Sequence, residues 1–262
     1  YSNSGALGED FSGEDNDFTV NNLTSLDQST DTCSTNFATA NSIGAQRIGG
    51  GSIRPTAYSE GNLRVVLGSS QYYTRATSTI AVPVGKWYWE TKMISNCDSS
   101  ADPTIGIIGT DGMQSSQTGT SPNSSMQYRY NGQKGYNNVG NASYGATWTN
   151  GDIIGIALDL DNNKLYFSKN GTFQNSGDPT TGSTGTGAVA IEAPSGTVDG
   201  VYYFAGGDNK NDGNTRMDFN FGNPAFALDS GNADADGHGD FEFAVPSGYF
   251  ALCTKNLAEY GG

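Results

Sequence analysis

The stretch Thr147–Gly171, TWTNGDIIGIALDLDNNKLYFSKNG, decides the fold because it holds two apolar runs separated by a turn signal. The runs are Ile153–Leu160 and Lys164–Ser168, and Asp161–Asn163 lie between them. Asn and Asp tolerate positive φ angles and hydrogen-bond to their own backbone, so this segment predicts a turn between two antiparallel strands.

Three aspartates in and around this hairpin raise the question of a catalytic or metal site. Asp152 directly precedes the first strand and Asp161 begins the turn, and both are positions where Asp is common. Asp159 lies on the same side of the strand as Asp161, so the two could share a cation. However, calcium takes about six to eight oxygen ligands, and no third ligand is nearby. We therefore expect turn and strand-end roles for all three.

Short strand candidates recur from Ile53 onward, separated by clusters of Gly, Asn, Asp and Pro. Outside the hairpin they are GNLRVVLG, STIAVP, GKWYWETKMIS, PTIGIIGT, SMQYRYNGQKGYNN, GVYYFAGGD and TRMDFNFG. This spacing predicts an all-β, two-sheet antiparallel sandwich. Alternation in GKWYWETKM places Trp87 and Trp89 on one face of their strand and Tyr88 and Glu90 on the other, so one face is core and the other is wet or covered.

The composition argues against several classes of partner. The chain has 262 residues, 37 of them Gly, and its 27 acidic and 13 basic residues give a net charge of -14. Such a charge repels phosphate backbones and anionic membranes, so we expect no nucleic-acid partner. No apolar run approaches the roughly 20 residues of a membrane helix, so we expect no membrane insertion. Cys33, Cys97 and Cys253 are far apart and odd in number, which predicts buried free thiols and folding in a reducing cytoplasm.

Several of these segments resemble the SPRY domain family. That family combines a YWEV-type strand, a GV strand and a GDVIGVALDLDNGKLYFYKNG-type hairpin, and this chain has GKWYWETKM, PTIGIIGT and the hairpin from Trp148 to Gly171 in the same order. The resemblance covers roughly Ala57 to Asn223. It implies a bent, jelly-roll-type (concanavalin-like) sandwich that binds proteins or other ligands through its loops without catalysis. It also implies that the acidic residues sit at a hairpin end and that Trp148 packs near the sheet.

The segments on either side resemble those that flank SPRY-like modules in tail and fibre proteins of marine tailed phages. They are SGALGEDFSGEDNDFTVNNLTSLDQSTDT from Ser4 and GDFEFAVPSGYFALCTKNLAEYG from Gly239. This resemblance implies a virion structural protein, although the sandwich that precedes such segments and the modules that follow them are not in this chain.

We expect three parts in the chain. Residues 1–52 are acidic and rich in Ser, Thr and Asn, which predicts an extended N-terminal arm or linker that does not fold alone. Residues 53–223 are the SPRY-like sandwich. Residues 224–262 form a C-terminal appendage, in which Pro246 and Gly248 separate a short strand from a short helical turn.

Two groups of residues are candidate binding sites. In MQYRYNGQKGY, we expect an exposed ligand-binding surface of Tyr128, Arg129, Tyr130 and Tyr136, and Tyr72 and Tyr73 invite the same interpretation; tyrosines that brace a sheet are the alternative. Asn232, Asp234 and Asp236 have the alternate spacing of a calcium loop with Gly237 at the turn, but the twelfth position is Phe243 instead of Glu. We favour a solvated acidic turn there and therefore expect no cofactor. Calcium is the one candidate ion for this turn.

We expect no enzymatic activity. A retaining glycosidase needs two carboxyl groups about 5 to 5.5 Å apart, and Glu90 is the only acid on its strand. His238 is the only histidine of the chain and lies in a Gly/Asp turn, so a Ser-His-Asp set is not plausible.

The features together predict a non-enzymatic phage structural or adhesion protein, either a tail fibre or a capsid fibre or decoration protein. It would be made in the host bacterial cytoplasm and reside in the virion. Its partners would be other virion proteins and a host-surface glycan or protein, and it would form a homo-oligomer, by default a trimer. The alternatives are an intracellular SPRY protein-interaction adaptor and, third, a carbohydrate-active enzyme.

Overall fold

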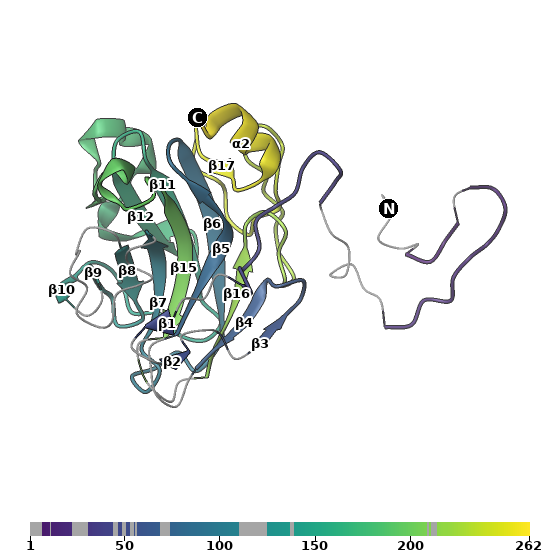
Figure 1. Ribbon diagram of the computed structural model, residues 1–262, viewed down its shortest axis with the longest axis horizontal. Coiled ribbons are helices and arrows are strands. Elements are labelled where there is room, and N and C mark those ends of the chain that lie inside the picture. Colours follow the sequence, from purple (N-terminus) through teal and green to yellow (C-terminus); the bar gives the residue numbers. More distant parts are fainter. Residues whose placement is uncertain are drawn as a thin grey trace.

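Two antiparallel β-sheets face each other in the computed structural model, which confirms the predicted all-β sandwich (Figure 1). The structure describes residues 7–10, 12–22, 31–43, 47–48, 51–52, 55, 57–68, 74–109, 125–136, 139–208, 210 and 214–262. No helix in these ranges is long and apolar enough to cross a membrane.

Among the residues that the structure describes, the first sheet has six strands. In spatial order they are β10 (Val139–Ser143), β9 (Gln133–Tyr136), β8 (Ser125–Arg129), β7 (Pro103–Ile108), β15 (Tyr202–Asp208) and β5 (Thr74–Val82).

The second sheet has nine strands within the described ranges. The main path is β13 (Thr172–Phe173), β12 (Lys164–Lys169), β11 (Ile153–Asp159), β6 (Lys86–Ser95), β16 (Thr215–Asn220), β4 (Arg64–Leu67) and β3 (Ala57–Ser59). Off this path, β14 (Val189–Ala190) pairs with β12 and β17 (Phe250–Ala251) pairs with β6.

The remaining elements are short. Among the described residues they are the β1–β2 hairpin (Arg47–Ile48 and Gly51–Ser52), the 3-10 helices η2 (Gln174–Ser176), η3 (Pro179–Thr184) and η4 (Pro194–Gly196), and the helix α2 (Thr254–Tyr260).

The predicted hairpin is β11 and β12, joined in register from Ile154 opposite Lys169 to Asp159 opposite Lys164. Asn163 has a φ of 55°, which is the positive backbone angle expected of Asn in this turn. Every residue of β11 is buried, because the strand lies in the middle of its sheet with a covered face on each side.

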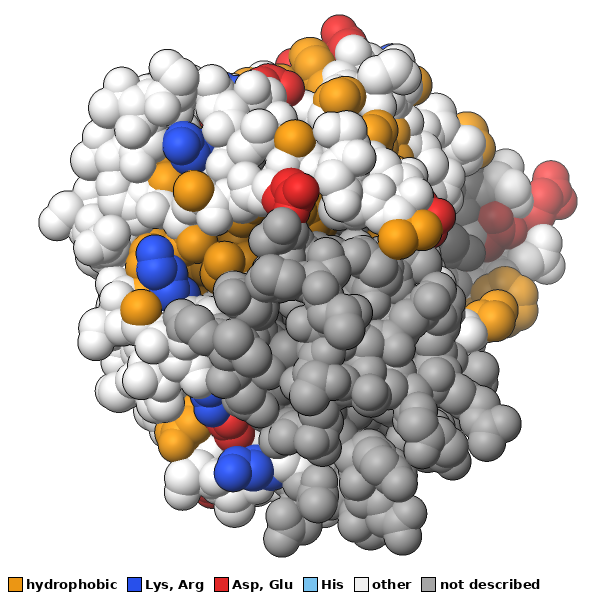
Figure 2. Space-filling view, turned by 60° about the vertical axis from the view of Figure 1, so that its left-hand side comes forward, with side chains coloured by type: hydrophobic (Ala, Val, Ile, Leu, Met, Phe, Trp, Pro, Cys, Tyr) orange, Lys and Arg blue, Asp and Glu red, His pale blue; other side chains and the backbone are white. Residues whose placement is uncertain are grey.

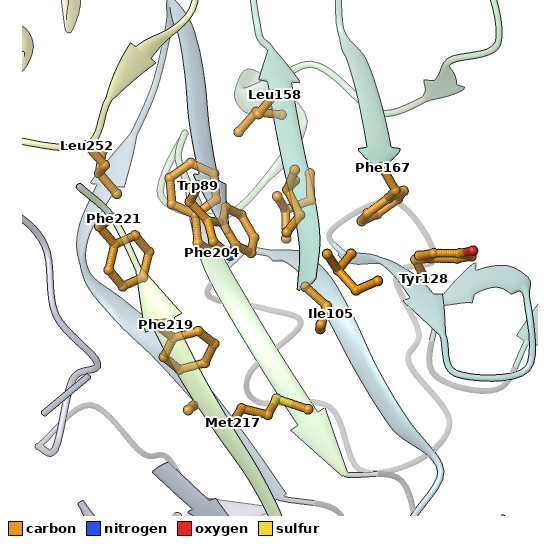
Figure 3. Close-up of a cluster of buried hydrophobic side chains, with 14 of the residues drawn as sticks. Trp89, Ile105, Tyr128, Leu158, Phe167, Phe204, Met217, Phe219, Phe221 and Leu252 are labelled. Atoms are coloured by element: carbon orange, nitrogen blue, oxygen red, sulfur yellow. The ribbon is translucent and has the colours of Figure 1, made fainter. Parts of the chain in front are cut away.

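The core lies between the sheets and consists of interlocked aromatic and aliphatic side chains (Figure 3). Trp87 and Trp89 both point into it, as their alternation predicts. The ring centroids of Trp89 and Phe204 are 4.0 Å apart. Phe204 comes from β15 of the opposite sheet, so this contact joins the two layers. Trp148 is also buried, 2% exposed.

The outer face of the nine-stranded sheet is covered by the C-terminal segment. Tyr88 and Glu90 point to this face, yet they are 1% and 0% exposed. They are buried because β17 runs parallel to β6 and a second apolar cluster, which includes Phe241 and Tyr249, packs over the sheet. The segment predicted as an appendage therefore completes the sandwich, and of the two expectations for this face the structure shows the covered one.

The N-terminal arm joins the body at residues 36–41. Phe37 forms an antiparallel bridge with Cys253, and Ala40 forms one with Ser78 at the edge of β5. Residues 12–22 project away from the body (Figure 1). The three cysteines are free, as predicted, but the expectation that all are buried is wrong for Cys33, which is exposed on the arm.

Candidate functional site

The outer face of the six-stranded sheet carries a row of small residues between longer side chains. Strand register places Gly207 between Arg75 and Thr104, and in the next row it places Gly106 between Ala205 and Gln127. Because directly paired residues share a face of an antiparallel sheet, these rows form a low floor with Arg75 on one side and Gln127 on the other.

This floor is the base of a small, shallow depression, with about 10 Å³ for the centres of water-sized atoms and about 220 Å³ of space when the open solvent at its mouth is included. Its walls and floor are formed by Arg75, Thr104, Gly106, Ile107, Ile108, Ser125, Gln127, Ala205, Gly206 and Gly207. The side of the molecule seen in Figure 2 shows Lys and Arg side chains spaced among hydrophobic ones, with Asp and Glu side chains on the same side.

Two polar atoms in the depression lack a partner. Ser125 Oγ and Gln127 Oε1 are buried, on residues that are 3% and 7% exposed, and neither makes a hydrogen bond to any other described residue. A buried polar atom without a partner costs about 1–3 kcal/mol. Both atoms can accept a hydrogen bond, so the depression is suited to a ligand that brings N–H or O–H donors.

Arg75 extends across the floor because Gly207 has no side chain. A Cβ at Gly207 would collide with the guanidinium of Arg75 and approach Thr104 Oγ1 to 2.9 Å. The guanidinium Nη1 donates to the carbonyl oxygens of Thr74 and Asp208, at 3.2 and 3.4 Å. These contacts hold a positive charge at one side of the depression.

The predicted tyrosine surface is only partly where the sequence suggested. Tyr128 is fully buried, with its ring 5.3 Å from that of Phe167, so it belongs to the core and the prediction that it is exposed is wrong (Figure 3). It faces inward because its partner across the sheet, Ile105, is a core residue.

The other members of the tyrosine group have different environments. Arg129 points outward and forms an ion pair with the buried Asp102. Tyr130 is half-buried and packs against the core. Tyr136 lies in β9, and its side chain is outside the described residues, as are Tyr72 and Tyr73. A binding role for these residues stays a prediction.

The acidic turn of Asn232, Asp234 and Asp236 is built around one buried carboxylate. Asp234 Oδ1 accepts hydrogen bonds from the backbone N–H groups of Asp236 and His238, at 3.0 and 2.9 Å. Its Oδ2 accepts from Ala251 N and Asn256 Nδ2, at 2.9 and 2.8 Å. The expected solvated turn is therefore wrong at Asp234, which is 7% exposed and ties the turn to β17 and α2.

Its two neighbours are also engaged within the fold. Asn232 Nδ2 donates to the carbonyls of Phe241 and Glu242, and Asp236 accepts from the Tyr260 hydroxyl at 2.8 Å. Within the described ranges, no cluster of three or more His, Cys, Asp or Glu side chains could hold a metal ion.

The hairpin aspartates have the structural roles expected of them. Asp159 accepts hydrogen bonds from the backbone and side chain of Asn162 and pairs with Lys86 at 3.4 Å. Asp161 accepts from Gly85 N at 3.1 Å. Asp152 accepts from Thr149 N at 2.8 Å, which supports the turn before β11.

The family comparison identifies the central part of the chain. Residues 86–189 match the family model described as "SPRY domain". This segment is a SPRY domain. The match contains the YWE strand, the GIIG strand and the hairpin from which the resemblance was inferred.

The relatives of this SPRY domain include animal Ran-binding proteins. Ran-binding protein 9 of Danio rerio is 32% identical over 105 residues, which are 37% of this chain and 16% of that protein. Ran-binding protein 9 of Xenopus tropicalis is 32% identical over 124 residues, 43% of this chain and 22% of that protein. The chain thus spans less than a quarter of the length of these relatives. A crystal structure of the SPRY domain of human HERC1 matches with a TM-score of 0.45 and 14% identity, over 60% of this chain and 87% of that one.

Sequence reasoning missed the residues that line the depression. Gln127 and Ser125 alternate with inward-facing Met126 and Tyr128, and only the tyrosines attracted attention. The available signal was Gly106 within an otherwise bulky strand, since a glycine inside a strand often marks the close approach of another backbone or a ligand.

Proposed function

We propose that this chain is a protein-interaction module whose SPRY sandwich binds an extended segment of a partner polypeptide in the depression. The observation that carries the proposal is the pair of buried, unpartnered acceptors, Ser125 Oγ and Gln127 Oε1, beside a floor of glycine and alanine. A floor without side chains lets a partner backbone approach closely, and backbone N–H groups are donors of the kind that these acceptors lack.

The relatives support the adaptor alternative over the virion role. Their names describe binding to Ran, and they come from animals. The phage role predicted from the flanking segments has no counterpart in them. Nor does either name describe an enzyme.

The test starts from a library of random peptides displayed on a surface and selected against the whole chain, with a glycan array run in parallel. A selected peptide is then titrated calorimetrically into wild type and Gln127→Met. This substitution keeps the length of the side chain and removes its acceptor. We expect affinity to fall by about 5- to 150-fold, which corresponds to about 1–3 kcal/mol for one hydrogen bond in a buried site.

Gln133→Met is the matched control, because Gln133 lies on the neighbouring strand β9 and does not line the depression. It should leave the affinity unchanged. Selected peptides that bind both variants as tightly as wild type would refute the depression as the site. Glycan binding that is lost in Gln127→Met, with no peptide selected, would replace the protein partner by a carbohydrate.

A second candidate function keeps the predicted virion role, and the arm favours it. Phe18 is 80% exposed on the projecting residues 12–22, and its neighbour Val20 is 44% exposed. An aromatic side chain this exposed gains apolar burial from contact with a neighbouring subunit. Incorporation of the chain into phage particles that is lost in Phe18→Ser would support this role, and its absence from purified particles would contradict it.

A further inference from the structure

The carboxyl group of Glu90 is buried under the C-terminal segment on the covered outer face of the nine-stranded sheet. Glu90 as a whole is 0% exposed. The segment that crosses it, residues 229–251, is called the strap below. It forms an isolated bridge between Asn232 and Phe241 and then runs on to β17.

Four donors converge on this carboxyl group. Two successive backbone N–H groups of the strap bind it, Phe243 N to Oε1 and Glu242 N to Oε2, both at 2.9 Å. The Tyr88 hydroxyl donates to Oε1 at 3.1 Å and Asn220 Nδ2 donates to Oε2 at 3.2 Å. Glu90 is thus the point at which the strap is hydrogen-bonded to the middle of the sheet.

The surroundings supply no compensating positive charge. Within the described residues, no Lys or Arg side chain forms an ion pair with Glu90. Its direct neighbours across the sheet are uncharged, Gly155 on β11 and Asn220 on β16. The next residues on this face of β6 are Tyr88, and Lys92, which lies 5.0 Å from the centre of the Phe226 ring.

The other charged groups around this face are acidic or already paired. The strap brings Asp229, Asp240 and Glu242, of which Glu242 accepts a hydrogen bond from Asp229 N. On β16, Asp218 pairs with Arg64 at 2.6 Å. On β6 and β11, Lys86 pairs with Asp159 at 3.4 Å. A negative charge on Glu90 would therefore be buried with hydrogen-bond donors as its direct partners and without an ion pair.

We propose that Glu90 is a proton-controlled latch, which holds the strap firmly on β6 when it is protonated and loosens the strap when it ionises. Burial raises the pKa of Glu90 from 4.5 to about 7, and the donated hydrogen bonds only partly offset this rise. A neutral carboxyl group can keep all its neighbours satisfied, because its proton can be donated to the Tyr88 oxygen while both strap N–H groups keep an acceptor.

The sign and size of the effect follow from proton linkage. In the open strap Glu90 is hydrated and its pKa returns to about 4.5, so the closed strap binds the proton more tightly. The opening equilibrium should rise tenfold per pH unit between about pH 4.5 and pH 7 and be constant above that. Between pH 5 and pH 9 it should increase close to 100-fold.

Hydrogen exchange of the whole chain, read by mass spectrometry over peptides that contain Glu242 and Phe243, measures this opening. After correction for the intrinsic pH dependence of exchange, protection of these amides should fall close to 100-fold from pH 5 to pH 9, with the fall ending near pH 7. The amide of Ile156 in the core of β11 is the internal reference and should show no such step.

Two variants separate the latch from a general loosening of the strap. In Glu90→Gln the step should disappear. In Glu242→Gln, which removes a neighbouring acid of the strap itself, the step should remain. A flat profile in wild type, or a step that persists in Glu90→Gln, would overturn the proposal.

The wild-type protein alone also decides the proposal if Glu90→Gln does not fold. The carboxyl carbon of Glu90, followed by NMR in protein labelled with ¹³C-glutamate, should titrate with a midpoint near pH 7. A midpoint at or below about 4.5, the ordinary value for Glu, would contradict the latch.

Discussion

Replacement of Asp234 by Ala tests whether one buried carboxylate organises the C-terminal segment. Asp234 receives four N–H donors, from Asp236, His238, Ala251 and Asn256. In Asp234→Ala all four lose their acceptor at once. The turn, β17 and the start of α2 would then be held together mainly by apolar packing.

The magnitude depends on which donors water can reach. Ala251 and Asn256 are 0% and 1% exposed. The Ala251 N–H group would be left buried without a partner, and Asn256 Nδ2 would keep only its hydrogen bond to the Ala251 carbonyl, at about 1–3 kcal/mol for each lost bond. The N–H groups of Asp236 and His238 lie in an exposed or half-exposed turn, where water can replace the carboxylate at little cost. We therefore expect Asp234→Ala to lower the free energy of unfolding by about 4 kcal/mol.

Urea unfolding followed by tryptophan fluorescence measures the loss. Asp236→Ala is the matched control. It removes a carboxylate from an exposed residue two positions further along the chain, so it should lower the free energy of unfolding by less than about 1 kcal/mol. A similar loss in both variants, or a loss below about 1 kcal/mol in Asp234→Ala, would refute the reasoning. Calcium on the order of 1 mM should leave the wild-type melting temperature unchanged, because N–H donors already take the oxygens of Asp234; a rise would restore the calcium-loop interpretation.

Two further predictions concern buried groups elsewhere. In Gly155→Ala, the new methyl group would lie 2.5 Å from Ser168 Oγ and 2.6 Å from the Tyr88 hydroxyl oxygen, so overpacking should cost about 1–3 kcal/mol in urea unfolding. A cost near zero would show that this layer is loosely packed. Burial raises the pKa of Asp208 from 3.8 to about 6, so its contribution to stability is present below about pH 3.8 and is lost as the pH rises to about 6. Asp208→Asn should therefore match wild type near pH 4 and exceed it by about 2 kcal/mol at pH 8, whereas equal stability at both pH values would contradict the buried charge.

The central hairpin could be predicted because its signals are local. Turn chemistry at Asp161–Asn163 and the apolar runs on either side lie within about twenty residues of each other, and strand pairing follows from them. The inward direction of Trp87 and Trp89 was predictable for the same reason, since alternation along one strand fixes the face of each side chain.

The covering of Glu90 and Tyr88 could not be predicted from the same pattern. Alternation shows that these residues share a face, but their cover comes from Glu242 and Phe243, about 150 residues further along the chain. The segment around them contains Pro and Gly, and only two of its residues, Phe250 and Ala251, pair with the sheet. Its position depends on hydrogen bonds to single side chains, which leave no periodic signal.

The tyrosine surface was misjudged for a related reason. Around Tyr128 both faces of β8 carry residues that occur inside and outside proteins, so alternation alone cannot assign the inner face. Pairing decides it: Ile105 on β7 is in the core, and its partner must be as well. The same pairing turns Gln127 outward opposite Gly106, and this combination is what a sequence search for a site should look for.

The outer faces of the two sheets both contain buried side-chain oxygens, but those of Glu90 accept hydrogen bonds from the described residues, whereas Ser125 Oγ and Gln127 Oε1 do not. On the nine-stranded sheet, the buried oxygens of Glu90 are satisfied by successive N–H groups of an extended segment, supplied by the chain itself. On the six-stranded sheet, the buried oxygens of Ser125 and Gln127 have no such donor among the described residues. An extended partner backbone that crosses the glycine floor would supply N–H donors to Gln127, as the strap supplies them to Glu90. The covered face therefore shows, within one molecule, how a polar side chain in a sheet can bind an extended polypeptide, and this is the binding mode that we propose for the depression on the six-stranded sheet.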